Sequence, residues 1–341
     1  MFVLQSAVVK GRGGIATAVQ HYERMFRTVG VRSAVLFRGP SLDLLREQGA
    51  DVIEAPRLVT SPIAGFAPVL GALRRAVMQR AHSEPIIVIP HSDLTLPALR
   101  RLLPRARFVT PCHSDKFKHK ARADLVVTLN AAQDAMARAA LPNTRVALLG
   151  NPYVSPPPAP LPPGGAPRFN FVGRFIPTKD PETLLRGVYM LAEPKVESRF
   201  VGAGDLEAEL RRIADGLSLN AAFPGWLAAP FAHFHRNDVL VLPSRWEGLP
   251  YLLQEALDHG VPIIAADNPG NRAALGDGAY GDLFPFGDAG LLAERMRAAL
   301  ADLDALRAKA EKGRAALRAR YGAEPFWRAL KAELESAPRH V

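Results

Sequence analysis

Short apolar runs alternate along the chain with longer segments in which apolar residues recur every three or four positions. The runs are rich in β-branched residues and too short for helices, which is the pattern of strands buried on both faces of a parallel sheet. The longer segments carry one apolar face each, as Val19, Tyr22 and Phe26 do in 16–29, and this is typical of amphipathic helices. Strands that alternate with helices at this rhythm predict an α/β fold with parallel sheets.

The expected strands are 2–9, 33–37, 52–53, 86–90, 107–110, 125–129, 146–149, 168–172, 199–201, 222–226, 239–242 and 261–266. The expected helices are 16–29, one within 56–82, 42–48, 97–103, 131–140, 181–191, 250–259, one that starts near 268–271, a helical pair at 289–319, and 324–336.

One stretch, 152–167, interrupts the alternation with the sequence P-Y-V-S-P-P-P-A-P-L-P-P-G-G-A-P. Proline joins neither sheet ladders nor helix interiors, so we interpret this stretch as a semi-rigid linker. A chain of 341 residues is long enough for two domains of ordinary size. We therefore expect one domain at 1–151, a second at 168–322, and a C-terminal helix at 323–341.

Composition indicates a soluble protein of a reducing compartment. Apolar residues make up 48% of the chain, enough for real cores, and the single cysteine, Cys112, rules out a disulfide framework and is expected to be a buried thiol. No apolar run reaches the roughly 20 residues that span a bilayer. The first cation, Lys10, follows the initial apolar run, which is the wrong order for a secretory signal. We expect a cytoplasmic location.

The excess of positive over negative charge lies in the first half of the chain. Residues 1–160 hold 21 of the 43 lysines and arginines but only 10 of the 33 aspartates and glutamates. Such a field attracts phosphates, anionic glycolipids, membrane surfaces or nucleic acid, although an arginine-rich solvated surface explains it equally well. The segment 116–122 is strongly basic and is either a solvated helix face or a docking surface for an anionic acceptor or membrane. No nucleic-acid-binding module is recognisable, so nucleic acid is not an expected partner.

The stretch 239–267 predicts strand, loop, helix, strand. Pro250 suits the first helical position, and Gly260 suits a left-handed helix stop. Amide groups at the start of such a helix, above the carboxyl edge of a parallel sheet, bind anions. Glu247 and Glu255 bracket the joint but lie eight residues apart, so they are not neighbours on one helix face. They either hold different parts of an elongated ligand or act as a helix cap and a solvated residue.

Other candidate residues follow predicted strands. A glycine-rich turn with Gly13 and Gly14 comes after the first strand, as in the opening of a Rossmann-like unit, and lets backbone approach a ligand closely. His91 and His113 stand just past strand ends, either as ligand contacts or as hydrogen-bonded loop histidines. Asp302 and Asp304 are expected in the middle of an amphipathic helix, as solvated surface, and we expect no metal site.

A loop after the strand 168–172 carries Arg174 and Lys179. A guanidinium fork and a compact ammonium both suit phosphate oxygens, although such residues are more often plain surface charges. Asp180 is expected to cap the helix that follows.

The run E-G-L-P-Y-L-L-Q-E-A-L-D-H-G-V-P-I-I-A resembles the glutamate–x7–glutamate signature of family 4 of the retaining glycosyltransferases, which have the GT-B fold. Glu247 and Glu255 fall on its two glutamates, and Gly248 and Pro250 match a common variant of the loop between them. The run F-V-G-R-F-I-P-T-K-D-P-E-T-L-L is similar to the glycine–arginine…lysine element of the same family. In the first half the resemblance is loose and rests on the glycine pair, His113 and the βα rhythm.

The resemblance implies a fold and a division of labour. It implies two Rossmann-like domains facing across a cleft, with a nucleotide-sugar in the second domain and the acceptor in the basic first domain. The C-terminal helix would cross back to the first domain. Gly13 and Gly14 would face the donor phosphates and the acceptor, and His113 would orient sugar hydroxyls or the β-phosphate.

The resemblance also implies residue roles around the donor. Arg174, Lys179 and the amides of the loop–helix joint would hold the diphosphate, Glu255 would bind the ribose hydroxyls, and Glu247 would contact the donor sugar and the reacting face. The residues of that joint are Gly248, Leu249, Pro250 and Tyr251.

The implied reaction is a retaining, metal-independent transfer in which the leaving phosphate serves as base. No cofactor is expected, since the nucleotide-diphosphate sugar, with a UDP-sugar favoured, is a substrate. The sugar would be a hexose or an N-acetylhexosamine, and the acceptor a lipid-linked, lipopolysaccharide or polysaccharide precursor at the inner membrane face, where the protein would be peripheral. The alternatives are a GT-B phosphorylase or epimerase, or a catalytically inactive sugar-nucleotide-binding subunit.

Overall fold

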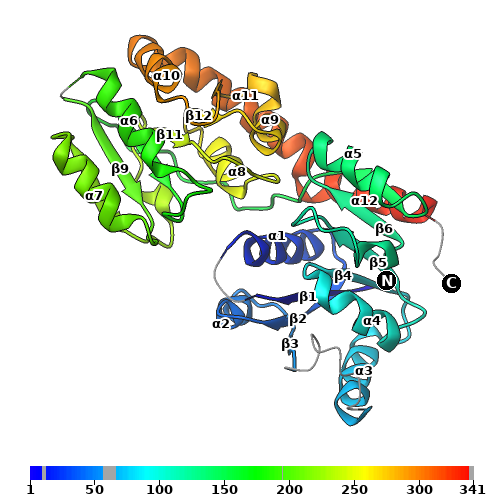
Figure 1. Ribbon diagram of the computed structural model, residues 1–341. Helices are drawn as coiled ribbons and strands as arrows, with labels where there is room; N and C mark the ends of the chain where they lie inside the picture. The colour runs from blue at the N-terminus through cyan, green and yellow to red at the C-terminus, as the bar shows by residue number, and fades with distance from the viewer. Residues whose placement is uncertain (10–12, 57–66, 194, 338–341) are drawn as a thin grey trace. The chain divides into compact units, whose positions relative to one another are not determined.

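The computed structural model describes residues 1–9, 13–56, 67–193 and 195–337. It divides into two compact units (Figure 1). Unit 1 comprises Met1–Ser155 together with Ala319–Val341, and unit 2 comprises Pro156–Arg318. The division after Ser155 falls inside the proline-rich stretch, whereas the second division falls within a helix, four residues before the expected end of the second domain at 322.

Unit 1 is built on a parallel sheet with the strand order β3-β2-β1-β4-β5-β6-β7. Strand β1 pairs in parallel with β2 on one side and with β4 on the other. This reversal of strand order is the topological switch point of a doubly wound sheet. The strands are β1 (Phe2–Val8), β2 (Arg32–Arg38), β3 (Val52–Glu54), β4 (Ile86–Pro90), β5 (Arg107–Pro111), β6 (Leu125–Thr128) and β7 (Arg145–Leu148).

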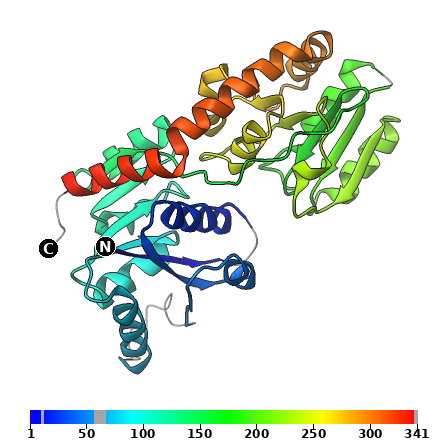
Figure 2. The same cartoon turned by 180° about the vertical axis from the view of Figure 1, so that it is seen from behind.

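Helices flank this sheet on both faces (Figures 1 and 2). The last helix of the chain packs on the first: the ring of Phe326 meets Tyr22 edge-on at 5.8 Å, and the ring of Trp327 meets Phe26 at 5.6 Å. Aromatic pairs in this geometry add stability beyond the area they bury. The helices of unit 1 are α1 (Gly14–Thr28), α2 (Leu42–Glu47), α3 (Ala67–Ala81), α4 (Leu96–Leu102), α5 (Ala131–Ala140) and α12 (Ala323–Ser336).

Unit 2 repeats the same winding with the order β10-β9-β8-β11-β12-β13, so its switch point lies between β8 and β11. Its core is aromatic: Phe171 stacks on Phe200, and Phe200 on Phe223, at ring distances of 6.2 and 5.0 Å. The strands are β8 (Arg168–Val172), β9 (Glu197–Val201), β10 (Ala221–Gly225), β11 (Val239–Leu242), β12 (Ile263–Ala266) and β13 (Asp282–Phe284), and the helices are α6 (Pro181–Leu191), α7 (Glu207–Gly216), α8 (Tyr251–Asp258), α9 (Pro269–Leu275), α10 (Ala289–Ala301) and α11 (Leu303–Tyr321).

Several local expectations were wrong. Pro250 is the N-cap of α8, in extended conformation, and the helix begins at Tyr251. Asp302 and Asp304 do not lie in mid-helix, because Asp302 is the C-cap of α10 and α11 begins at Leu303, but both are exposed as expected. The helix α7 and the strand β13 were not expected, since α7 is largely polar and β13 is only three residues long.

The basic segment 116–122 is not one solvated face. Lys120 begins a short 3-10 helix, Lys120–Arg122, and its side chain is fully buried. Its Nζ donates to Asp93 Oδ2 at 2.6 Å and to the carbonyls of Ser114 and Lys116. A buried ammonium needs such partners, because burial without them is costly. This lysine is therefore a structural cation, whereas Lys116, Lys118 and Arg122 are exposed.

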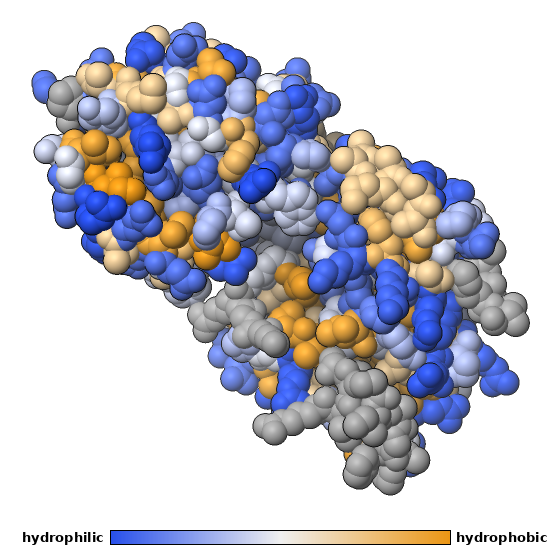
Figure 3. All heavy atoms as spheres, in the orientation of Figure 1, coloured by the Kyte–Doolittle hydropathy of each residue, from blue (hydrophilic) through white to orange (hydrophobic). Residues whose placement is uncertain are grey.

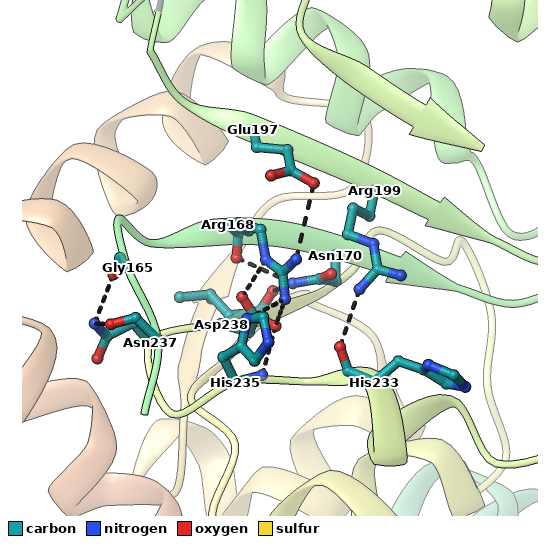
Figure 4. Close-up of polar contacts among 11 residues, drawn as sticks. Gly165, Arg168, Asn170, Glu197, Arg199, His233, His235, Asn237 and Asp238 are labelled. Atoms are coloured by element: carbon teal, nitrogen blue, oxygen red, sulfur yellow. Dashed lines mark hydrogen bonds and ion pairs between the residues drawn. The ribbon is translucent and has the colours of Figure 1, made fainter. Parts of the chain in front are cut away.

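The proline-rich segment is tied to the amino edge of the unit 2 sheet (Figure 4). Arg168, at the start of β8, donates from Nε and Nη2 to the two carboxylate oxygens of Asp238 at 2.8 and 2.6 Å. The Asn237 side chain donates to the carbonyls of Gly164 and Gly165. This edge is opposite to the one at which parallel sheets bind ligands, so the cluster is a structural anchor.

We expect Asp238→Asn to lower the free energy of unfolding by about 2 kcal/mol, because it leaves the partly buried Arg168 guanidinium without its bidentate carboxylate. Urea denaturation followed by circular dichroism measures the change. The matched control is Asp304→Asn, because Asp304 pairs with Arg307 but its own side chain is 88% exposed, and the substitution should cost less than about 0.5 kcal/mol. Equal losses in the two variants would contradict the anchor.

Candidate functional site

Two loops meet at the carboxyl edge of the unit 2 sheet, at its switch point. One follows β8 and the other follows β11. The backbone N–H of Arg245 donates to the carbonyl of Thr178 at 3.0 Å, and Lys179 Nζ donates to Glu247 Oε1. The structure thus brings together two residues predicted from separate motifs, 68 positions apart.

The Lys179–Glu247 pair is largely shielded from water. The Lys179 side chain is 25% exposed and the Glu247 side chain 10%. Charged groups at this depth are normally retained only with a partner, and each is the partner of the other. Glu247 stands three residues before Pro250, the N-cap of α8. The Lys179 ammonium that pairs with Glu247 therefore lies near the positive end of the α8 dipole.

The first turn of α8 lies at the same edge of the sheet and carries the positive end of the helix dipole. Pro250 has φ −72° and ψ 120°, and its carbonyl already accepts from the N–H groups of Leu253 and Gln254. The amides of a first turn point along the axis, away from the helix ladder, which makes this end attractive to negative charge. Glu255 lies further along the same helix and is half-buried, so it and Glu247 occupy separate places, as their spacing predicted.

Close backbone packing fixes these loops. A Cβ on Gly270 would come within 2.3 Å of the Glu247 carbonyl oxygen, and one on Gly202, where φ is +144°, within 1.8 Å of the Gly173 carbonyl. Only glycine fits such contacts. Asn268, the N-cap of α9, also donates from Nδ2 to the Ser244 carbonyl at 2.9 Å. Sequence reasoning missed Asn268 and Gly270, although the Asn-Pro-Gly turn was a signal.

Arg174 is placed differently from Lys179. Its side chain is exposed in the loop after β8. No hydrogen bond or ion pair joins its guanidinium to any residue in the described part of the chain. It is therefore available to a ligand, whereas Lys179 is already engaged by Glu247.

Exposed aromatic side chains follow three strands of unit 2 at the same edge. Trp226 comes after β10 and is 56% exposed, Trp246 after β11 and is 48% exposed, and Phe286 after β13 and is 41% exposed. Large apolar side chains are normally shielded from water, so aromatics exposed at a ligand-binding edge offer flat faces for bases or sugars. The sequence interpretation singled out 222–226 and missed Trp246 and Phe286.

The glycine pair of unit 1 is open. Gly13 is the N-cap of α1, and a Cβ on Gly13 or Gly14 would meet no described atom within 4 Å. Gly13 has φ 176°, an extended conformation that any residue adopts. The fold therefore does not require glycine at either position among the residues that the structure describes.

His113 and His91 follow the ends of β5 and β4 and contact each other. His91 Nδ1 lies 3.0 Å from His113 Nε2, and the two rings stack with centroids 5.3 Å apart. Burial, with the charge of Lys120, lowers the pKa of His113 to about 4, and burial lowers the pKa of His91. Both imidazoles are neutral at pH 7. Cys112 is fully buried as expected, and burial raises its pKa to about 12.

In residues 1–9, 13–56, 67–193 and 195–337, no three His, Cys, Asp or Glu side chains come together as a metal site requires. No helix of the same described ranges combines the length and hydropathy needed to cross a bilayer. Hydrophilic and hydrophobic side chains are interspersed on the face seen in Figure 3.

Comparison with known proteins shows similarity over unit 2. Residues 157–316 match the family model described as "Glycosyl transferases group 1", and this segment is nearly all of unit 2. The D-inositol 3-phosphate glycosyltransferase of Geodermatophilus obscurus is 34% identical over 157 residues, 42% of this chain and 35% of that protein.

A second relative is the UDP-Gal:alpha-D-GlcNAc-diphosphoundecaprenol alpha-1,3-galactosyltransferase of Escherichia coli. It is 30% identical over 127 residues, 35% of this chain and 33% of that protein. The chain therefore spans about a third of the length of the curated relatives it matches.

Among solved structures, Anabaena HepE in complex with UDP and glucose matches with a TM-score of 0.76 at 18% identity, over 98% of this chain and 100% of that one. At this identity the likeness shows the fold. The protein has the GT-B fold of two Rossmann-like parallel-sheet domains, as predicted. The family match supports a glycosyltransferase, and assignment to family 4 stays a prediction.

We expect Gly270→Ala to lower the free energy of unfolding by about 1–3 kcal/mol, because its Cβ would push the Glu247 carbonyl out of place. Differential scanning calorimetry measures the loss. Gly216→Ala, at the end of α7 with nothing within 4 Å of the added Cβ, is the control and should leave the melting temperature unchanged or slightly higher. A melting temperature that does not fall in the Gly270 variant would contradict the close packing.

Proposed function

We propose that the protein is a retaining, metal-independent glycosyltransferase of family 4. It transfers a hexosyl or N-acetylhexosaminyl group from a nucleotide-diphosphate sugar, with UDP-sugars favoured, to a glycan or glycolipid acceptor. The observation that carries the proposal is the Lys179–Glu247 pair beside the first turn of α8, at the switch point of the family-matched unit. The names of the relatives and the UDP and glucose bound to HepE support it.

Stabilising the departing diphosphate is the main electrostatic task of this reaction. A nucleoside diphosphate leaves as a multiply charged anion while the anomeric carbon becomes positive, and preorganised cations and amides lower the energy of that state. Lys179 Nζ, the amides of the first turn of α8 and the exposed Arg174 would supply the positive charge. Binding of the diphosphate would share Lys179 with Glu247 and turn the carboxylate toward sugar hydroxyls.

The other predicted residues would act around this centre. Glu255 would accept hydrogen bonds from the ribose hydroxyls, and the exposed faces of Trp226 and Trp246 suit the base or the sugar. Gly13 and Gly14 would let the backbone of unit 1 approach the donor phosphates or the acceptor. The leaving phosphate itself would remove the proton from the acceptor, which gives retention of configuration.

The acceptor that we propose is a lipid-linked or polysaccharide precursor at the inner face of the cell membrane. The excess of basic residues in 1–160 and the diphosphoundecaprenol in the name of the Escherichia coli relative support this choice. Attraction between a basic surface and anionic lipid weakens with salt. Co-sedimentation with anionic liposomes that is salt-insensitive or absent would contradict the membrane location.

Turnover tests the reaction. A panel of UDP- and GDP-sugars is incubated with the protein and lipid-linked acceptors, with and without EDTA, and release of the nucleoside diphosphate is measured. With one donor we expect release of the nucleoside diphosphate, and this release should continue in EDTA. We also expect the anomeric carbon of the product to keep the configuration that it has in the donor. Loss of turnover in EDTA would contradict metal independence, and formation of a sugar 1-phosphate from a glycan and added inorganic phosphate would favour a phosphorylase.

We expect Lys179→Met to weaken UDP binding by roughly 10- to 100-fold, because one charge-assisted contact contributes about 1.5–3 kcal/mol. Isothermal titration calorimetry measures the affinity, and circular dichroism checks that the variant is folded. Lys195→Met removes an exposed lysine from the turn before β9 and should leave UDP affinity unchanged. If both variants bind UDP like the unmodified protein, the diphosphate site is elsewhere.

A further inference from the structure

A chain of hydrogen bonds runs from His113 into the core of unit 1. His113 Nε2 meets His91 Nδ1 at 3.0 Å, and His91 Nε2 meets Gln5 Oε1 at 3.0 Å. Gln5 Nε2 donates to Glu23 Oε2 at 3.0 Å, and Ser33 Oγ donates to the same carboxylate at 2.9 Å. Gln5, Glu23 and His91 are buried, so water has little access to the chain.

The carboxylate gives the chain a direction. Burial raises the pKa of Glu23, and the hydrogen bonds from Ser33 and Gln5 and the positive charge of Arg27 offset only part of that rise. Gln5 Nε2 and Ser33 Oγ both donate to Glu23, as they would to an ionised carboxylate. An ionised carboxylate only accepts hydrogen bonds, so the amide nitrogen of Gln5 must face Glu23. The amide oxygen of Gln5 then faces His91, and that oxygen can only accept.

The direction passes through both imidazoles. His91 is neutral, so one ring nitrogen donates and the other accepts. Since His91 Nε2–H donates to Gln5, His91 Nδ1 must accept, and the donor to it is His113 Nε2–H. His113 is neutral as well, which leaves its Nδ1 without a proton. No hydrogen bond joins this Nδ1 to a residue that the structure describes, and the His113 side chain is partly exposed.

We propose that Glu23, acting through Gln5 and His91, fixes His113 as the Nε2–H tautomer, so that His113 Nδ1 accepts a hydrogen bond from a hydroxyl group of the donor sugar. The choice of ligand group rests on the function proposed above. Phosphate oxygens at neutral pH are acceptors and would find no proton on this nitrogen. The β-phosphate, which the sequence left open as the partner of His113, is therefore disfavoured. Glu23, Gln5 and His91 are positioning residues.

Packing fixes the orientation of the rings in this chain of hydrogen bonds, which we call the relay. The ring of Tyr22 meets His91 edge-on with centroids 5.0 Å apart, and Tyr22 is itself fully buried against Phe326 of α12. The charged group that acts on His113 is Lys120, which is paired with Asp93. The charged groups that act on Glu23 are Arg27 and Asp51.

Nitrogen NMR reads the tautomers directly. The full-length protein, labelled with 15N-histidine, is examined at pH 7.5 by long-range 1H–15N correlation, which separates protonated from bare ring nitrogens. His91→Asn and His113→Asn assign the two rings among the nine histidines. We expect a protonated Nε2 and a bare Nδ1 in both rings. A protonated Nδ1 on His113 in the unmodified protein would overturn the relay.

Variants of the distant carboxylate test its control of His113. Glu23→Gln replaces an obligate acceptor with a group that also donates, so we expect a measurable fraction of His113 with Nδ1 protonated. Ser33→Ala removes one hydrogen bond but keeps the carboxylate, and should leave the tautomer unchanged. If Glu23 were only structural, Glu23→Gln would lower stability and leave the tautomers unchanged. That result would overturn the proposal. If Glu23→Gln does not fold, the tautomers of the unmodified protein still decide.

Added nucleotides test the ligand group. UDP, UDP-glucose, UDP-galactose and UDP-N-acetylglucosamine are titrated into the labelled protein, and binding is checked by calorimetry. We expect a sugar nucleotide that binds to shift the bare Nδ1 resonance of His113, and UDP alone to leave it in place. A bound sugar nucleotide that does not move this resonance would overturn the hydroxyl contact. Correct tautomers without binding of any sugar nucleotide would instead count against the proposed function.

Discussion

The site depends on a contact between two loops that are far apart in the sequence. Lys179, from the loop after β8, and Glu247, from the loop after β11, neutralise each other at a depth where neither charge would remain alone. Their pairing requires β8 and β11 to be neighbours, and they are neighbours only because the strand order reverses between them. In the function that we propose, the switch point creates the place where a cation and a helix N-terminus act on one anion.

Unit 1 uses the same winding for a different purpose. Its switch point lies between β1 and β4, and polar residues from β1 and from the loop after β4 meet there. Gln5 in β1 and His91 after β4 belong to a buried relay rather than to a charged pair. One unit therefore holds positive charge for an anion, while the other holds a neutral imidazole whose hydrogen-bonding direction is set from the core.

The pattern of apolar residues predicted most elements, since strands buried on both faces and amphipathic helices leave clear periods. α5, α6 and β8 have the predicted bounds. α7 was missed because its apolar positions are few, and the burial of Lys120 was missed because its partner Asp93 lies 27 positions away. The relay could not be predicted from the sequence either. Gln5 is a polar residue in an otherwise largely apolar strand, and Glu23 resembles any acidic residue on a helix. Local patterns show elements, whereas polar partners across a sheet require the fold.

A crystal structure of the protein with UDP would locate the diphosphate. We expect it beside the first turn of α8, within hydrogen-bond distance of Lys179 Nζ, with the Lys179–Glu247 contact shared or opened. A diphosphate bound elsewhere on unit 2, with that contact intact, would contradict this expectation.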